Sequence, residues 1–578
     1  MLRALAWTAL LSALPLGCAP PPADPSLILH GGRVYTLAWD DPDAEGRPAP
    51  GAPFDGERWA PDAQAVVVRD GRIAFVGPDA EALAMRGPAT RIVDLDGATV
   101  VPGLVESHGH LHEIGEKAGE VSLVGATTEA ELATRLQGAA DGLADGEWLQ
   151  GSGWDEGLWA DALPDRAFLD ALFPDRPVVL RGLRGFGTLG NARALEAAGL
   201  TADTPDPIGG TLVRRADGGL SGVLLNNATD LLHDAVPPRS LERRMETLEH
   251  GMRELLRAGY VATHDAGVRT AYLPAYLALA ETGRLPMRVE ALLAVGVPDA
   301  PDPAPWLQAG PTADPEARLQ VRSVKAYYDG SLGSRGARLL ADYADAPGHR
   351  GVAGADYGFD PEAVEAYVAA GFQAAVHAIG DAANRDVLDL YAAVLERHPE
   401  ARALRHRVEH AQVVAPEDMA RFGELGLVAS MEPGHAVEDS DWAEARLGPD
   451  RVRGAYAWRS LRRGGALLLF NSDFTGTDWS PFYGLYAAQT RRQRDGSPAG
   501  GWYPEEAVTA EEALRAYTVW PARASGVEAR TGTLEPGKWA DLTVLSLDPL
   551  TTPPDALLDG AVRLTVVRGE VQYDAADR

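Results

Sequence analysis

The sequence has almost no cysteine and too few basic residues to balance its acids. Cys18 is the only cysteine among 578 residues, which excludes an internal disulfide framework and a thiolate metal cluster. Any bound metal must therefore be held by histidine, by a carboxylate or by an oxygen derived from lysine. Lysine and arginine number 53 against 83 acidic residues, giving a formal net charge of −30. A chain this negative repels phosphate backbones and has no basic patch, so we do not expect nucleic acid as a partner.

The apolar run at the start of the chain is too short to cross a bilayer. It extends from Ala4 to Leu16, whereas a spanning helix needs ~20 apolar residues, and it suits the centre of a signal peptide. The run stops at Cys18, before a proline-rich stretch that would form a stiff tether. This arrangement resembles a bacterial lipoprotein signal, although Pro15 stands where that pattern usually has leucine.

We therefore expect residues 1–17 to be a signal peptide and residues 18–26 a tether. Export from the bacterial cytoplasm follows, with membrane contact only through a lipid anchor on Cys18. An ordinary secretory signal that happens to contain a cysteine is the alternative. No heptad repeat or exposed apolar stripe marks a subunit interface, so the sequence leaves the oligomeric state open.

Both ends of the chain are rich in short strand-like runs. Residues 27–97 include AVVVRDGRIAFVG, in which Asp70 and Gly71 are a strong hairpin signal. Residues 528–578 have the same texture, with a turn at Arg568 and Gly569. Neither segment is large enough to bury a core alone, so we expect the two ends to pair in one split sheet domain.

The middle of the chain alternates strand-like runs with helical stretches, a pattern typical of βα units. Eight runs end in polar residues, from ATVVPGLVESHGH to ALLLFNSD, which predicts an α/β fold with a (β/α)₈ barrel over residues 98–527. The count treats about 113–257, which contains the run PVVLRGL, as an insertion after the first strand. A doubly wound open sheet is the alternative, but no glycine-rich phosphate-binding fingerprint supports it.

Residues able to bind a metal or transfer a proton fall at the ends of these runs. They are His108, His110, Lys325, His377, His410 and Asp473. Histidines two apart on a strand point to the same side, so the first two imidazoles can face one ion. Imidazole and carboxylate ligands suit Zn²⁺ and similar divalent ions.

Lys325 is the unusual member of this set. Partial desolvation near a metal lowers the pKa of an amine, and the neutral amine can take up CO₂ to form a carbamate that bridges two cations. The alternative is an ion pair of Lys325 with Asp329 or Asp473 that has no metal role.

Seven segments together resemble the amidohydrolase superfamily, and within it the YtcJ-like branch that includes N-substituted formamide deformylase. The resemblance covers residues 27–573, and the segments that carry it read VPGLVESHGHLH, VKAYYDGSLGSRGARL, VHAIGDAAN, HRVEHAQ, NSDF, ALRAYTVWPARASG and GTLEPGKWADLTVL. The resemblance implies a barrel that carries a small β-sandwich built from both chain ends. This agrees with the strand pattern.

The resemblance also implies a role for each metal-site residue. His108 and His110 would bind the more buried metal, Lys325 would be a carboxylated bridge, and the second metal would be bound by His377 and His410. Asp473 would be both a metal ligand and the catalytic acid/base. One or two divalent ions, zinc first among them, would lower the pKa of water to ~7 and polarise the substrate carbonyl.

The predicted activity is hydrolysis of an amide-type, non-peptide C–N bond in a small molecule. Deamination of a cyclic amidine, or opening of a lactone or imide ring, is the alternative on the same site. A catalytically inactive surface lipoprotein that binds a ligand is the alternative of another class.

Four further residues are predicted to bind the substrate, and His435 is predicted to take part in catalysis. His435 matches a family histidine and would donate to the substrate oxygen. Asp329 and Arg335 lie on a glycine-rich loop, where Arg335 either clamps a substrate carboxylate or pairs with an aspartate to fasten the loop. Phe186 and Glu432 stand where the family usually has histidine and glutamine, so we expect this pocket to differ from those of its relatives.

Overall fold

The computed structural model describes residues 24–119, 121–123, 125–126, 128–143, 146–154, 163–182, 187–207, 210–297, 299–474 and 477–577. The predicted signal peptide, Cys18 and Phe186 lie outside these ranges. Within them, no helix combines the length and the apolar character needed to cross a membrane.

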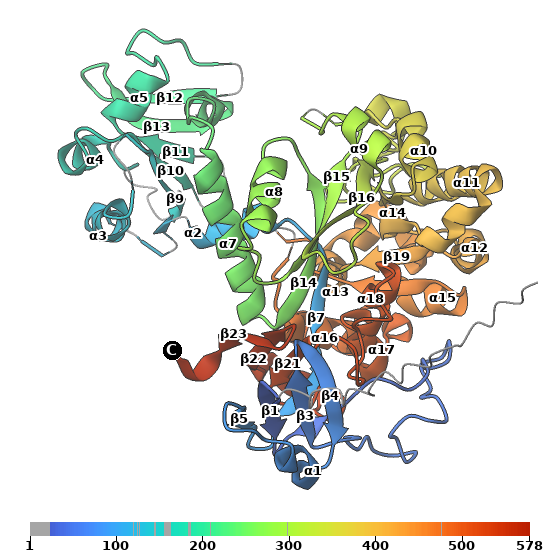
Figure 1. The fold of residues 1–578 in the computed structure, drawn as a ribbon. Coiled ribbons are helices and arrows are strands. Elements are labelled where there is room, and N and C mark those ends of the chain that lie inside the picture. The colour runs from blue at the N-terminus through green and yellow to red at the C-terminus, as the bar shows by residue number, and fades with distance from the viewer. Residues whose placement is uncertain are drawn as a thin grey trace, which may run out of the picture.

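Eight parallel strands form the central sheet, and they coincide with the eight predicted runs (Figure 1). In sheet order they are β7 (Leu104–Gly109), β14 (Tyr260–Val268), β15 (Arg288–Ala294), β16 (Leu319–Tyr327), β17 (Gln373–Ala378), β18 (Arg407–His410), β19 (Val428–Met431) and β20 (Leu467–Phe470). The last strand returns to the first, where Ser107 Oγ donates to the carbonyl of Phe470 at 2.8 Å. The predicted (β/α)₈ barrel is therefore confirmed.

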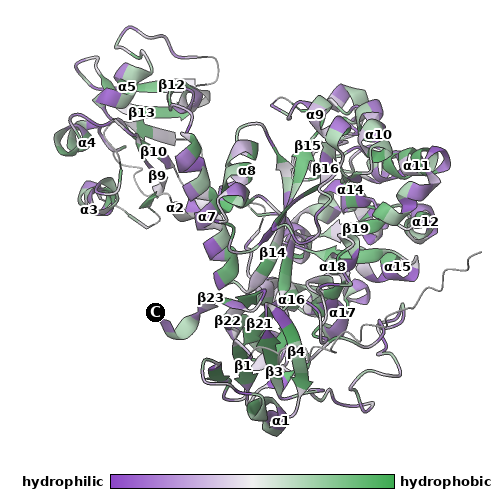
Figure 2. Cartoon of the chain, viewed as in Figure 1, coloured by the Kyte–Doolittle hydropathy of each residue, from purple (hydrophilic) through white to green (hydrophobic). Residues whose placement is uncertain are grey.

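Helices connect these strands and cover the outside of the barrel. They include α7 (Leu241–Arg257), α8 (Leu273–Glu281), α9 (Pro303–Ala309), α10 (Pro361–Ala369), α11 (Asp381–Arg397), α12 (Met419–Leu425), α13 (Pro433–Glu438), α14 (Ala443–Arg451), α15 (Trp458–Arg463), α16 (Pro481–Thr490), α17 (Ala510–Ala516) and α18 (Val519–Ala524). Helix α7 begins where the Ser240 side chain accepts from the backbone N–H of Arg243, and it buries Leu248, Met252 and Leu255 on one face. Figure 2 accordingly shows apolar strands inside and mixed hydropathy on the surrounding helices.

The two chain ends form a pair of sheets below the barrel. The first sheet contains β4 (Arg72–Gly77), β3 (Ala65–Arg69), β1 (Leu27–His30) and β5 (Arg91–Asp94). The second contains β2 (Arg33–Val34), β6 (Thr99–Pro102), β21 (Leu542–Leu545), β22 (Val562–Val567) and β23 (Glu570–Asp574). Leu29, Val68, Leu542 and Val566 belong to one buried apolar cluster between them. The small β-sandwich built from both ends is confirmed.

The segment after β7 forms a separate lobe with a six-stranded sheet (Figure 1). Its strands are β12 (Gly210–Arg214), β13 (Leu220–Asn226), β11 (Gly187–Gly190), β10 (Val178–Gly182), β9 (Leu149–Trp154) and β8 (Val121–Ser122). Helices α3 (Glu129–Ala140), α4 (Ala167–Leu172) and α5 (Ala192–Ala197) belong to the same lobe. The sheet lies within the predicted insertion, and β10 is the predicted PVVLRGL run.

Helix α2 (Leu111–Gly119) starts directly after the H-x-H motif and packs against α7. The two helices meet at Gly115 and Gly251, where an added β-carbon would overlap with backbone atoms of the other helix. Glycine is therefore required at both positions for the close approach of these helices. The crossing joins the lobe to the barrel beside the first metal-site strand.

Candidate metal centre

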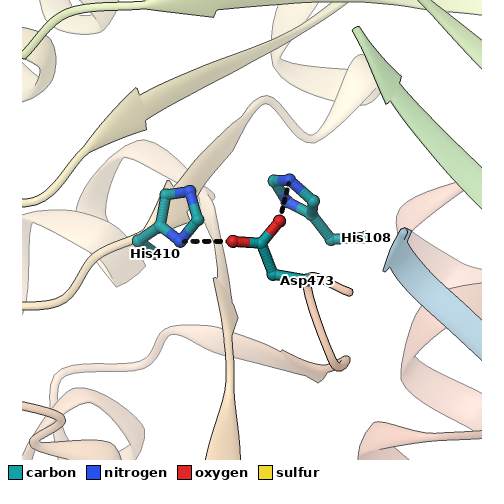
Figure 3. A group of neighbouring side chains, drawn as sticks. All are labelled: His108, His410 and Asp473. Carbon is teal, nitrogen blue, oxygen red and sulfur yellow. Dashed lines mark ion pairs between the residues drawn. The ribbon is translucent and has the colours of Figure 1, made fainter. Parts of the chain in front are cut away.

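The six predicted metal-site residues lie at the carboxyl ends of barrel strands. His108 is in β7 and His110 follows it, Lys325 and His377 are in β16 and β17, and His410 ends β18. Asp473 follows β20 by three residues. Nitrogen and oxygen atoms of His108, His410 and Asp473 all lie within 4.8 Å of one another, an arrangement able to hold a metal ion (Figure 3).

The Asp473 carboxylate lies at the centre of this cluster. Its Oδ1 is 3.1 Å from His110 Nε2 and 3.4 Å from His108 Nε2, and its Oδ2 is 4.0 Å from His410 Nδ1. Lys325 Nζ is 3.2 Å from His108 Nε2. The centroids of the His377 and His410 imidazole rings are 4.5 Å apart, so His377, the last of the six residues, also lies in this cluster.

Backbone conformation helps to aim two of these side chains. His410 and Asp473 have φ of 70° and 44°, in the left-handed region that residues other than glycine seldom adopt. The Asp473 N–H donates to the carbonyl of His108 at 3.0 Å, which fastens the turn after β20 to β7. Strained backbone of this kind collects at functional sites, where the surrounding structure holds it in place.

The electrostatics of the cluster favour neutral imidazoles at His108 and His410 and an ionised carboxylate at Asp473. For His110, the hydrogen bond to Asp473 and the acidic charges nearby together outweigh burial and raise the pKa. Burial lowers the pKa of His108 to about 3 and that of His410 to about 4, which leaves lone pairs free for a cation. Burial also lowers the pKa of the Lys325 amine. Burial alone would raise the pKa of Asp473, but the histidines around it, His108 first, hold this pKa well below its usual range.

These residues fit a divalent metal. The group provides imidazole nitrogens and a carboxylate, the ligand types that zinc prefers where thiolates are absent. His377 Nε2 is also buried without a hydrogen-bond partner among the described residues. The alternative ion pairs of Lys325 are not formed in the described part of the chain: neither Asp329 nor Asp473 makes a salt bridge with its amine.

Glu409 orients His108, a role that the sequence did not reveal. Its Oε2 is 2.5 Å from His108 Nδ1, and its Oε1 accepts from Arg407 Nε at 2.6 Å. A carboxylate on Nδ1 fixes the ring so that Nε2 faces the metal site. Glu409 precedes His410 on β18, but its partner His108 is on β7. A sequence signal for such a role is the charged pair Arg407 and Glu409 within a buried strand.

Glu432 is fully buried next to two histidines. Its Oε2 lies 3.1 Å from His410 Nδ1 and 3.8 Å from His435 Nδ1, while Oε1 has no hydrogen-bond partner among the described residues. Burial raises its pKa to about 8. The residue thus touches the metal-site histidine and the predicted catalytic histidine, and its contact with substrate stays a prediction.

Asp329 and Arg335 fasten loops in this structure. Asp329 is buried and accepts from the backbone N–H groups of Ile379, Gly380 and Arg338 at 2.8–2.9 Å. Arg335 donates to both oxygens of Asp345 at 3.1 and 2.8 Å. It therefore fastens the loop, which was the alternative to binding a substrate carboxylate, and its partner is Asp345 and not Asp329. Substrate contact by either residue stays a prediction, as does that of Phe186, which lies outside the described residues.

Two other residues near the site have anchoring contacts. His264 bonds Arg407 and Ser525 at 3.0 Å each, and Asp265 accepts from the backbone N–H of Leu111 at 2.8 Å. Both side chains therefore hold neighbouring segments in place.

Curated relatives match most of the chain. It is 33% identical over 523 residues to Protein LONG AFTER FAR-RED 3 of Arabidopsis thaliana, with 86% of each chain covered. It is 31% identical to the putative amidohydrolase YtcJ of Bacillus subtilis (strain 168), covering 95% of this chain and 99% of the relative. It is 29% identical to N-substituted formamide deformylase of Arthrobacter pascens, covering 89% and 95%.

A solved structure and a family pattern agree with these relatives. An uncharacterized metal-dependent hydrolase from Pyrococcus furiosus matches with a TM-score of 0.69 and 26% identity, covering 91% of this chain and 100% of that one. The pattern of the amidohydrolase family matches residues 91–573, which include the barrel and the part of the sandwich from β5 onward. The predicted resemblance is thereby confirmed, and the chain belongs to the amidohydrolase family.

Proposed function

We propose that this protein is a metal-dependent hydrolase that cleaves an amide-type, non-peptide C–N bond of a small molecule. The observation that carries the proposal is the meeting of six metal-site side chains at one end of the barrel. When bound there, one or two divalent ions, zinc first among them, would activate water and polarise the substrate carbonyl. The relative named N-substituted formamide deformylase makes N-substituted formamides the first substrates to test.

In this proposal, side chains of the protein transfer the proton and stabilise the substrate oxygen. Asp473 is ionised and central, so it accepts a proton from the attacking water and returns it to the leaving nitrogen. His435 would donate to the substrate oxygen. The support is that its Nε2 has no hydrogen-bond partner among the described residues, while its Nδ1 lies 3.8 Å from Glu432 Oε2. Glu409 keeps Nε2 of His108 turned toward the metal site.

The decisive experiment removes the metal and the acid/base separately. Dialysis against a chelator should abolish hydrolysis of N-benzylformamide, and zinc should restore it. Asp473→Asn should lower kcat by at least about 10²-fold, the usual contribution of a positioned acid/base. Asp389→Asn, which changes an exposed surface carboxylate, is the matched control and should keep full activity. A protein without stoichiometric metal, together with an active Asp473→Asn variant, would refute the mechanism.

Lys325 is proposed to be carboxylated and to bridge two ions. The buried amine, with its lowered pKa, lies beside His108, where a carbamate oxygen would reach the cluster. Two metal ions per chain, and loss of one of them in Lys325→Ala, are the expected results. One ion per chain with an active Lys325→Ala variant would favour the deaminase alternative.

The protein is further proposed to act outside the cytoplasm, attached through a lipid on Cys18. The support is the sequence pattern around this single cysteine. Cys18→Ser should move the protein from the membrane fraction to the soluble fraction after export. Membrane attachment that survives the substitution would contradict the anchor.

A further inference from the structure

Tyr327 has a free hydroxyl beside the metal centre. Its ring lies 5.0 Å from Lys325 Nζ, and its centroid is 5.8 Å from that of His377. The hydroxyl reaches across to the end of β14, where a β-carbon built on Gly267 would be 2.6 Å from it. It forms no hydrogen bond within the described ranges, although a phenol can both donate and accept.

Arg269 is a free cation at the same rim of the barrel. It follows the last residue of β14, and its carbonyl accepts from the N–H groups of Tyr272 and Leu273 at 3.1 Å each, which holds the start of α8. The side chain is exposed and has no ion pair or hydrogen bond in the part of the chain that the structure describes. Its charge nevertheless acts on the Tyr327 phenol, lowering a pKa that burial raises to about 12.

The acidic groups around Tyr327 do not neutralise Arg269. Asp265 uses one oxygen for the N–H of Leu111 and the other for the hydroxyl of Tyr276. Asp473 is held by the metal-site histidines, and Glu113 lies 3.9 Å from His112. Tyr327 and Arg269 thus belong to the ends of β16 and β14 at one rim of the barrel, where the Tyr327 hydroxyl reaches Gly267, two residues before Arg269. Neither polar group has a side-chain partner among the described residues, whereas Arg335, the cation predicted to bind substrate, is paired with Asp345.

We propose that Tyr327 and Arg269 form a subsite that binds a carboxylate of the substrate, the phenol through one hydrogen bond and the guanidinium through a charged pair. A guanidinium and a phenol can each donate to an oxygen of a carboxylate, and the guanidinium also supplies the opposite charge. The inference rests on the proposed function and narrows its substrate class to amides that carry a carboxylate, such as N-formyl amino acids.

Equilibrium binding tests the subsite without any turnover. The probes are 3-phenylpropionate and 3-phenyl-1-propanol, which share a phenylpropyl group and differ in the carboxylate, titrated calorimetrically into the metal-loaded protein. Arg269→Gln and Tyr327→Phe should each weaken binding of the carboxylate by about tenfold or more, as expected for hydrogen bonds to a charged group, and leave the alcohol unaffected. Arg253→Gln, on the exposed face of α7, is the matched control and should change neither.

Three results would overturn the subsite. Equal carboxylate binding by wild type, Arg269→Gln and Tyr327→Phe would mean that the probe is held elsewhere, for example by the metal. Loss of 3-phenylpropionate binding in Arg335→Gln alone would show that the carboxylate binds at the Arg335 loop. Equal loss of the acid and the alcohol would show a steric effect. Failure of the proposed function appears separately, as a wild type that binds the probe but hydrolyses neither N-formylphenylalanine nor N-formylphenethylamine.

Discussion

A residue outside the predicted metal set, Glu409, orients the imidazole of His108. Glu409 is completely buried, and its two oxygens join His108 to Arg407. Arg407 in turn donates to the carbonyl of Ser107 at 2.7 Å, which links β18 back to β7. The orientation of His108, a predicted metal ligand, thus depends on a buried ionic chain that links β18 to β7.

Glu409→Gln tests this dependence. The substitution keeps the shape but removes the charge, so His108 loses its orienting carboxylate and Arg407 loses its partner. We expect metal affinity to fall about 10- to 100-fold, measured by competition with a chromogenic chelator. Glu417→Gln, which breaks an exposed pair with Arg385, is the control and should bind metal normally. Unchanged affinity in Glu409→Gln would show that His108 is oriented by its strand alone.

At the scale of elements, the α2–α7 crossing connects the lobe to the metal centre. Helix α2 begins one residue after His110, and its Gly115 lies against Thr247 of α7. The opposite glycine, Gly251, lies against the carbonyl of Leu111. Any side chain at the crossing must push α2 away from α7 and so disturb the segment that follows the first strand.

Gly251→Ala should therefore destabilise the protein by about 1–3 kcal/mol, the usual cost of overpacking. Thermal unfolding monitored by circular dichroism would measure it. Gly138→Ala is the matched control, since Gly138 lies in helix α3 with open space around it, and it should stabilise by about 0.5–1 kcal/mol. Equal behaviour of the two variants would show that the helices separate without cost.

For the whole molecule, the sandwich is fixed to the barrel by buried polar contacts. Asp541, which precedes β21, pairs with Arg288 at the start of β15 and accepts from the N–H of Arg568 at 2.8 Å. Thr543 Oγ1 donates to the carbonyl of Gly259 at 2.6 Å. These contacts lie at the amino ends of the strands, the face of a barrel that serves stability, whereas the metal centre lies at the carboxyl ends.

Asp541→Asn should lower stability by about 3–5 kcal/mol, because Arg288 is left buried without its counter-charge. A shift of the urea unfolding midpoint, followed by tryptophan fluorescence, would report this loss. Activity per folded molecule should stay unchanged, since the contact is far from the metal centre. Asp574→Asn, which breaks a more exposed pair with Arg91, should cost no more than about 1 kcal/mol. Similar midpoints for both variants would contradict the buried anchor.

The sequence alone determined the barrel, the split sandwich and the meeting of six metal-site residues. Strand periodicity and polar residues at strand ends are local properties, and the barrel topology gathers those ends at one rim. The pairing of charges across the rim depends on the tertiary structure. Glu409 contacts His108 from 301 residues away, Arg335 pairs with Asp345, and Arg269 has no side-chain partner among the residues that the structure describes. Such pairings depend on distances between strands and loops that are remote in sequence, and no local pattern encodes them.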